Sequence, residues 1–352
     1  MARKIFVRVH LNLHLSLLLI LNRTGITGYI GGQTVAHLVQ TRPDLDITAL
    51  VRNEEQTRIV KIAFPETKTV IGDLDSVDLL VQLSAEADVV LQCASADHPV
   101  GTAAIAKGIR QKRKPAGSAP GFLIHTSGTG ILGDPDQPYG SAPTALYDDV
   151  ADIKTITSFP LTRWHRNVDK IILEAAACDP IENPKIKTTI VCPPTIYGTG
   201  TGPIRTRSVQ LPDLAKASLR RGGALNVNEG RAYVILVEEA LKGGGEADWN
   251  AEGYYFVENG HNVWRDLASA VGVDGFRKGY FKAAAAEALS VEEALKLQGP
   301  PLPGRSLRGV NPLGIASRIR RLRWKPYRSS TWDSVSDAVD IEARALGVKG
   351  WS

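Results

Sequence analysis

Three evenly spaced glycines make up the part of this sequence best suited to bind a phosphate. They lie in Thr24-Gly25-Ile26-Thr27-Gly28-Tyr29-Ile30-Gly31, a T-G-x-x-G-x-x-G stretch between an apolar run at 17–21 and an amphipathic segment at 33–39. Glycine allows a tight turn and a close approach of the backbone to a phosphate, while the free N–H groups and dipole of a helix start attract its charge. A strand, this turn and a helix together predict a binding site for the pyrophosphate of a dinucleotide.

The residue after the next predicted strand indicates which dinucleotide is bound. Residues 47–51 form an apolar run, and Arg52 follows it, about 20 residues beyond the glycines. A dinucleotide site contacts the adenosine ribose here: an acidic residue favours a free 2′-hydroxyl, and a basic one favours a 2′-phosphate. Arg52 therefore favours NADP over NAD, and the alternative is an exposed arginine in an ordinary loop.

Polar or small residues follow the next two predicted strands as well. The strand at 70–74 ends in Gly72-Asp73-Leu74, and the Asp73 carboxylate could accept a hydrogen bond from the adenine amino group. The strand at 87–95 runs into Cys93-Ala94-Ser95. Small residues at this point allow a cofactor to lie close against the backbone, so these residues are predicted cofactor contacts.

Five predicted strands alternate with helical stretches along the first part of the chain. They lie at 17–21, 47–51, 70–74, 87–95 and 122–128. This alternation predicts an α/β fold with a Rossmann-type, doubly wound parallel sheet. Ligands bind outside the carboxyl ends of the strands in such sheets, and every candidate above lies at a carboxyl end.

The chain is predicted to divide unevenly. Residues 1–187 supply most of the dinucleotide-binding Rossmann domain, and residues 188–330 form a small substrate-facing C-terminal lobe that includes a sixth strand at 188–192. Residues 331–352 form a terminal helix that is expected to return to the main sheet.

Several motifs resemble those of extended or atypical short-chain dehydrogenases/reductases of the NAD-dependent epimerase/dehydratase type. Besides the glycine stretch, they are Gly72-Asp73-Leu74, His125-Thr126-Ser127-Gly128, Cys192-Pro193-Pro194-Thr195-Ile196-Tyr197-Gly198 and Arg323-Trp324-Lys325-Pro326. The stretch that begins at Cys192 resembles the R-P-x-x-x-Y-G segment in which the family's sixth strand meets nicotinamide and substrate. The resemblance, which covers residues 24–345, therefore implies that Pro194 and Thr195 contact the cofactor.

The sequence departs from that family at two places. The family's first strand runs straight into the glycine stretch, whereas here residues 8–23 follow a strand-like start at 1–7. Either 17–21 replaces the native strand, or 8–23 is an insertion such as translated intron sequence. Near Gly230-Arg231 a short segment of the family pattern is missing, so the resemblance also implies a splicing variant or a faulty gene model.

The proton donor is the least defined part of the predicted site. Enzymes of the resembled family use a Tyr and, four residues later, a Lys on one face of a helix. Here His165 takes the approximate place of the Tyr and Asp169 that of the Lys. The two share a helix face, and an imidazole exchanges protons near neutral pH, so His165 is the candidate general acid with Asp169 as the group that orients it or raises its pKa. The alternative is an ordinary pair on the helix surface.

Other residues are candidates for substrate binding or proton transfer. Ser127, at the end of the fifth strand, is the candidate catalytic contact to substrate or nicotinamide, although the family's serine position falls on Gly128. Tyr139 and Tyr147 lie in a loop rich in Pro and Gly and are alternative phenolic donors.

These features predict an NAD(P)-binding protein that transfers a hydride between nicotinamide and a small carbonyl, alcohol or sugar-like substrate. Because the Tyr–Lys pair is missing, the alternative is a non-catalytic protein that binds or senses NADP(H). No metal-ligand spacing occurs in the sequence, and no metal is expected. A homodimer is expected from the resemblance.

Charge and composition argue against nucleic acid and membrane as partners. The net charge of +5 is small for 352 residues, and two basic clusters, at 107–114 and 318–323, lack interleaved aromatics and are expected to be solvated. Arg3, Lys4 and the apolar run after them resemble a signal peptide, but polar residues interrupt the run and no A-x-A site follows. With three cysteines and no C-x-x-C spacing, the sequence predicts a cytoplasmic location, and a secretory or ER-associated one is the alternative.

Overall fold

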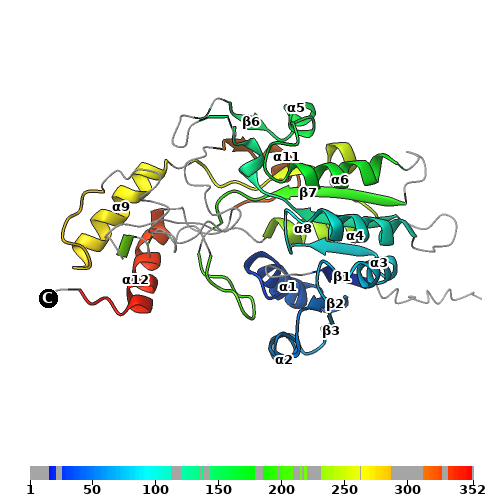
Figure 1. Cartoon of the computed structure of the whole chain (residues 1–352), viewed down its shortest axis with the longest axis horizontal. Coiled ribbons are helices and arrows are strands. Elements are labelled where there is room, and N and C mark those ends of the chain that lie inside the picture. The colour runs from blue at the N-terminus through cyan, green and yellow to red at the C-terminus, as the bar shows by residue number, and fades with distance from the viewer. Residues whose placement is uncertain are drawn as a thin grey trace, which may run out of the picture.

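A parallel sheet forms the centre of the protein (Figure 1). The structure is a computed structural model that describes residues 16–20, 26–111, 120–134, 136–137, 143, 145–178, 185–196, 198–208, 215, 218–219, 231–261, 263–286, 312–326 and 332–350. Within these residues the sheet has seven strands in the order β3-β2-β1-β4-β5-β7-β8. Their bounds are β1 (Ser16–Ile20), β2 (Asp46–Val51), β3 (Lys68–Ile71), β4 (Val89–Gln92), β5 (Gly121–Thr126), β7 (Ile186–Cys192) and β8 (Tyr254–Phe256).

The strand order reverses at β1, which pairs in parallel with both β2 and β4. This reversal is the topological switch point at which doubly wound sheets bind their ligands. The Rossmann-type sheet predicted from the sequence is therefore confirmed.

Helices pack against both faces of the sheet. α1 and α8 contact each other, while α3, α4 and α6 form a second contacting group. The bounds of these helices and of α2, which lies against β3, are α1 (Tyr29–Thr41), α2 (Glu54–Ala63), α3 (Val77–Glu86), α4 (Pro99–Gln111), α6 (Arg166–Ala177) and α8 (Arg231–Leu241).

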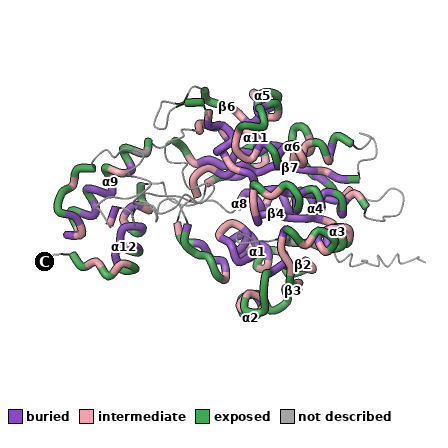
Figure 2. The backbone as a smooth tube through the Cα atoms, in the orientation of Figure 1, coloured by how far each residue is buried: buried purple, intermediate pink, exposed green. Residues whose placement is uncertain are grey.

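Burial explains why the inner strands consist almost entirely of apolar residues. β4 and β5 are buried at every position, as expected for strands covered by helices on both faces (Figure 2). Val35 and Leu38 of α1 are fully buried, so the apolar face predicted for that helix is the one that packs on the sheet.

The C-terminal helix does not lie where the sequence predicts it. α12 (Val335–Leu346) follows a short 3₁₀ turn, η4 (Trp332–Ser334), and packs against α9 (Trp264–Arg277). Val335 and Val339 join Leu267 and Val271 in an apolar cluster separate from the main core. The expected return to the main sheet is therefore wrong, because the apolar face of α12 is covered by α9; Figure 1 shows the two helices beside the main body.

One basic residue expected on a solvated surface lies in the interior instead. Arg318, in α11 (Ser317–Arg321), is 3% exposed and donates to the Asp149 carbonyl at 2.9 Å. It also pairs with Asp248 and Glu252. The prediction for the cluster at 318–323 is wrong at this position, because the charge of Arg318 is neutralised inside the protein.

Arg318 links a small second sheet to the main one, because it contacts Asp149, directly after β6 (Tyr147–Asp148), and also Asp248 and Glu252, which precede β8. The small sheet is formed by β6 and β9 (Gly314–Ile315), which pair in parallel. Three short elements complete the described structure, η1 (Thr129–Leu132), α5 (Ile153–Thr157) and η2 (Asn250–Glu252).

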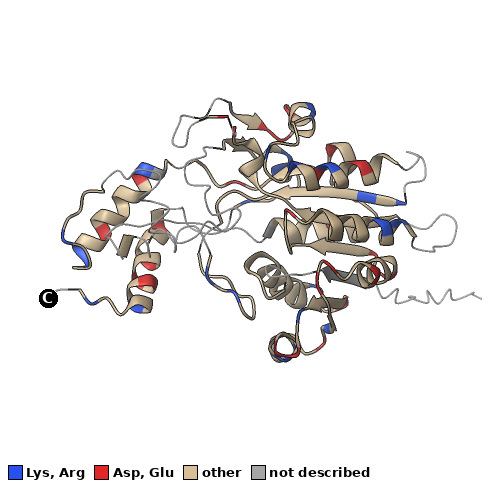
Figure 3. Cartoon of the chain, in the orientation of Figure 1, with Lys and Arg blue, Asp and Glu red and all other residues tan. Residues whose placement is uncertain are grey.

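Ser16–Ile20 form β1, the strand that leads toward the glycine stretch, one residue earlier than predicted. That 8–23 is an insertion stays a prediction. Residues 1–15 and the junction before Arg231 lie outside the described residues. No helix in the described part is long and apolar enough to cross a membrane. Figure 3 shows that α2, α9 and α12 each carry both acidic and basic residues.

Candidate cofactor and catalytic site

The glycine stretch forms the turn that leads into α1. Gly28 is the N-cap of this helix, with an extended backbone and no side-chain cap, and the first turn contains no acidic residue. Thr27, Gly28 and Gly31 are buried, and Tyr29 and Ile30 are half-buried; Thr24 and Gly25 lie outside the described residues. The first N–H groups of a helix have no partner within it, so this end of α1 is suited to hold an anion.

A further glycine that the sequence analysis missed fixes the packing of this turn. A Cβ on Gly32 would lie 2.9 Å from both the Ile26 carbonyl oxygen and the Gly202 Cα. Only glycine permits this backbone-to-backbone approach. The sequence signal was the repeated glycine at 31 and 32, of which only the first fits the motif.

The predicted adenosine contacts lie after β2 and β3. Arg52 is exposed, and its guanidinium makes no contact with the described residues that would neutralise it. Asp73 accepts hydrogen bonds through Oδ1 from the Ser76 hydroxyl at 2.8 Å and the Asp75 N–H at 3.1 Å. The Ser76 hydrogen bond is the main factor that lowers the pKa of Asp73 and keeps it ionised. Leu74 is fully buried.

The residues after β4 and β7 lie at the same edge of the sheet. Cys93 and Ala94 are buried and Ser95 is half-buried; burial raises the pKa of the Cys93 thiol to about 12, so it is not a nucleophile at neutral pH. Pro194 and Thr195 are half-buried after β7.

Of the two alternative phenolic donors, only Tyr147 lies within the described residues. Tyr147 packs edge-on against Phe159, with ring centroids 5.3 Å apart, and lies in β6 rather than in a loop. Tyr139 lies outside the described residues.

His165 is held by a carboxylate that sequence reasoning did not select. The His165 Nδ1 lies 2.7 Å from Asp97 Oδ1. Asp97 belongs to the loop between β4 and α4. Burial lowers the pKa of His165, but the hydrogen bond and charge of Asp97, together with the charge of Asp169, outweigh it and raise the pKa above 6.5. The group that orients the imidazole is therefore Asp97, and Asp169 has only the second of its two predicted roles, since its charge helps to raise the pKa of His165.

The other ring nitrogen of His165 faces the end of β5. A Cβ on Gly128 would lie 3.1 Å from His165 Nε2, so the imidazole occupies the space that a side chain at 128 would need. His165 has φ of 64°, a left-handed conformation that is uncommon outside glycine and is found at functional sites. It caps α6 rather than lying inside the helix as predicted.

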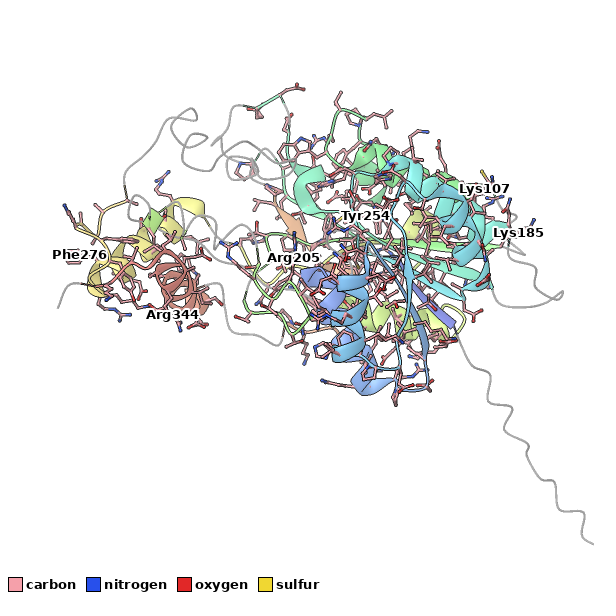
Figure 4. All side chains as sticks on the ribbon, turned by 60° about the horizontal axis from the view of Figure 1, so that its bottom comes forward. Lys107, Lys185, Arg205, Tyr254, Phe276 and Arg344 are labelled. Atoms are coloured by element: carbon pink, nitrogen blue, oxygen red, sulfur yellow. The ribbon has the colours of Figure 1, made fainter. Side chains whose placement is uncertain are left out.

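Asp169 and Ser127 belong to a separate, fully buried network. Asp169 Oδ2 accepts from the Ser127 hydroxyl at 3.0 Å and from the Tyr254 hydroxyl at 2.6 Å. Its other oxygen, Oδ1, has no hydrogen-bond partner among the described residues, and neither does His125 Nε2, 3.9 Å away. Figure 4 shows Tyr254 deep inside the main body.

The hydrogen bonds around His125 define its tautomer. Gln92 Nε2 donates to Thr102 at 2.9 Å, so Gln92 Oε1 accepts from His125 Nδ1 at 2.8 Å. The bare Nε2 lone pair then faces Asp169 Oδ1 across 3.9 Å, which is too far for a hydrogen bond, and a proton on Oδ1 removes the repulsion between the two facing lone pairs. Burial, the largest effect on both groups, raises the pKa of Asp169 to about 6 and lowers that of His125 to about 3.

The three predicted catalytic residues therefore divide into two groups. His165 lies with Asp97 at the sheet edge, while the oxygens of Ser127 and Asp169 face each other in the core. Asp97 approaches from a loop 68 residues away along the chain, and Tyr254 from a strand 85 residues beyond Asp169. No local spacing in the sequence could have joined either to its partner.

Comparison with known proteins agrees with this geometry. A family model described as NAD(P)H-binding matches residues 25–218, and the chain belongs to this family. The chain is 29% identical over 350 residues to the oxidase ucsJ of Acremonium sp, with 92% of this chain and 98% of that protein covered.

Two solved structures share the fold. One is DesIV, a dTDP-glucose 4,6-dehydratase from Streptomyces venezuelae with NAD and TYD bound, with a TM-score of 0.60, 17% identity, and 94% of this chain and 97% of the other covered. The other is the yeast methylglyoxal/isovaleraldehyde reductase in complex with NADPH, with a TM-score of 0.56, 13% identity, and 95% and 99% covered. These likenesses agree with the resemblance to extended short-chain dehydrogenases/reductases in fold, and the family match shows that the protein is NAD(P)-binding.

Proposed function

We propose that the protein transfers a hydride between NADP(H) and a small carbonyl, alcohol or sugar-like substrate, with His165 as the acid and base. The observation that carries this proposal is the His165–Asp97 pair, whose free nitrogen faces Gly128 at the carboxyl edge of the sheet. The nicotinamide supplies the hydride chemistry, and the protein orients the substrate against it.

In the direction of reduction, a bound NADPH would supply the hydride for the carbonyl carbon, and the Nε2 proton of His165 passes to the carbonyl oxygen. Throughout the step, Asp97 accepts a hydrogen bond from the Nδ1–H group of His165. Its negative charge stabilises the imidazolium, and the Nδ1 proton stays on His165. The His165 side chain is itself 13% exposed, so solvent can restore the proton to Nε2 after each turnover.

A paired titration with NADPH and NADH, followed by turnover on a panel of aldehydes, ketones and keto sugars, tests this function. Tight binding with NADPH oxidation by at least one carbonyl supports the proposal. Tight binding with no turnover in either direction would instead favour the second candidate, a non-catalytic NADP(H)-binding protein. The buried carboxyl of Asp169 at the position of the family's Lys is the observation that favours that candidate.

Arg52→Asp is expected to weaken NADPH binding at least about tenfold while NADH binding changes little, because an arginine held against a phosphate makes a strong charged hydrogen bond. The Kd values of both cofactors, measured by nicotinamide fluorescence, check this. Arg58→Asp is the control, since Arg58 is exposed on α2 and is paired with Glu55. Equal losses for the two cofactors would refute a role for Arg52 at the 2′-phosphate.

The pH dependence of reduction is expected to follow the protonated form of His165. Because Asp97 raises the pKa of His165, kcat/KM should stay high to above pH 6.5 and fall as the pH rises through that raised pKa. Asp97→Asn removes the charge, so the fall should move to lower pH. A profile that is unchanged in Asp97→Asn would show that another group supplies the proton.

Assembly and location remain part of this proposal. We expect a homodimer, which light scattering on the purified protein measures directly, and no nucleic acid as partner. Cys93, Cys178 and Cys192 form no disulfide, which is consistent with a cytoplasmic, reducing compartment.

A further inference from the structure

Residues 198–208, which we call the strap, form a short hairpin between β7 and the C-terminal half of the chain. Thr199 and Arg207 form an antiparallel bridge, and the Gly200 N–H donates to the Thr206 carbonyl at 2.7 Å. These contacts give the strap two arms with a defined geometry.

The strap is seated directly on the first turns of α1. The Tyr29 hydroxyl donates to the Gly198 carbonyl at 3.1 Å, and the Thr201 N–H donates to Gln33 Oε1 at 2.8 Å. Gly202 lies against Gly32 so closely that a Cβ on either would meet the other's Cα at 2.9 Å. One arm of the strap is thus fixed to the helix that follows the glycine turn.

The other arm brings Arg205 to the glycine turn itself. The Arg205 N–H donates to the Thr27 carbonyl at 3.2 Å, one residue before the N-cap of α1. Its side chain is exposed, and within the described residues its guanidinium makes no hydrogen bond or ion pair. Arg207, on the same arm, is neutralised by the buried Glu342 of α12.

Arg205 also lies at the correct edge of the sheet. Lys185 directly precedes β7 and marks the amino ends of the parallel strands. In Figure 4, Lys185 and Lys107 lie at one end of the main body, while Arg205 lies toward the other end, which faces Phe276 and Arg344 of the α9–α12 pair. Arg205 therefore stands at the carboxyl edge, where the cofactor binds.

We propose that Arg205 binds the diphosphate of the cofactor beside the glycine turn, as a phosphate contact contributed by the strap. This inference rests on the proposed function. The first turn of α1 offers backbone N–H groups and contains no acidic residue, so a bound diphosphate keeps a net negative charge there. A guanidinium can pair with that charge through two parallel hydrogen bonds. The match of the NAD(P)H-binding family model includes the strap as well as the glycine turn.

Three ligands distinguish a diphosphate contact at Arg205 from a 2′-phosphate contact at Arg52. ADP-ribose carries the diphosphate without a 2′-phosphate, adenosine 2′-monophosphate carries only the 2′-phosphate, and NADPH carries both. Arg205→Ala should weaken ADP-ribose and NADPH about tenfold each and leave adenosine 2′-monophosphate unchanged. Arg205→Lys should recover part of the loss, because it keeps the charge but not the paired geometry.

Lys107→Ala is the matched control, because it removes one exposed positive charge at the opposite end of the main body. Calorimetric Kd values for the three ligands in wild type, Arg205→Ala, Arg205→Lys and Lys107→Ala give the comparison. Unchanged ADP-ribose affinity in Arg205→Ala would overturn the proposal, and so would a rise in substrate KM as the only effect, which would assign Arg205 to a phosphate on the substrate. Failure of the wild-type protein to bind NADPH would instead contradict the proposed function itself.

Discussion

His165→Asn is expected to lower kcat by at least about a hundredfold while the Kd of NADPH stays near that of wild type. General acid catalysis by a positioned side chain contributes about 10²–10⁴-fold, and asparagine has no titratable proton to donate. Asparagine is the suitable replacement because His165 has a φ of 64°, and asparagine tolerates this left-handed conformation better than most residues. The amide can still bond to Asp97, so the backbone around Gly128 should be preserved.

Single-turnover measurement of hydride transfer and a separate cofactor titration distinguish a catalytic from a structural effect. His261→Asn is a suitable control, since His261 is exposed and its ring contacts only the Gly314 carbonyl among the hydrogen bonds described. If His165→Asn retains wild-type kcat, the proton comes from elsewhere and the role of His165 is to cap α6. Equal weakening of kcat and cofactor binding would point to a collapsed site rather than a lost proton donor.

The fold could be predicted because its signals are local. Alternating apolar runs and helical stretches, with glycines at the first turn, define each unit within a few residues, and β2, β5 and β7 lie within two residues of their predicted bounds. The position of α12 was predicted wrongly for the opposite reason. Its apolar face is evident in the sequence, but whether α9 or the sheet covers it depends on packing between distant segments.

The candidate site divides in the same way. The turn at Gly28 is a local pattern, and its packing against the strap is not, because Gly202 is far from Gly32 in the sequence. The backbones of His165 and Asp169 lie one helix turn apart, since the Asp169 N–H donates to the His165 carbonyl at 3.0 Å. Their side chains nevertheless face different partners, because His165 sits at the N-cap with a left-handed backbone that no spacing rule predicts.

Asp169→Ala is expected to lower the free energy of unfolding by about 3–5 kcal/mol, since it leaves the Ser127 and Tyr254 hydroxyls buried without their acceptor and opens a cavity. Asp169→Asn should behave very differently. Its amide oxygen can accept from both hydroxyls, and its amide group turns an N–H instead of a lone pair toward the bare Nε2 of His125, as a protonated carboxyl does. Denaturant unfolding of the two variants measures the contrast.

The stability difference between wild type and Asp169→Asn is expected to depend on pH. The pKa of Asp169 is raised from 3.8 to about 6, chiefly by burial, so between these values the native state binds more protons than the unfolded one. The stability of wild type should therefore fall by up to about 3 kcal/mol from this group as the pH rises from about 4 to 6. Asp169→Asn lacks this loss and should match wild type near pH 4 and exceed it at pH 8. If the variant is instead as unstable as Asp169→Ala at both pH values, the network needs an ionised carboxylate, and the assignment of a proton to Oδ1 is wrong.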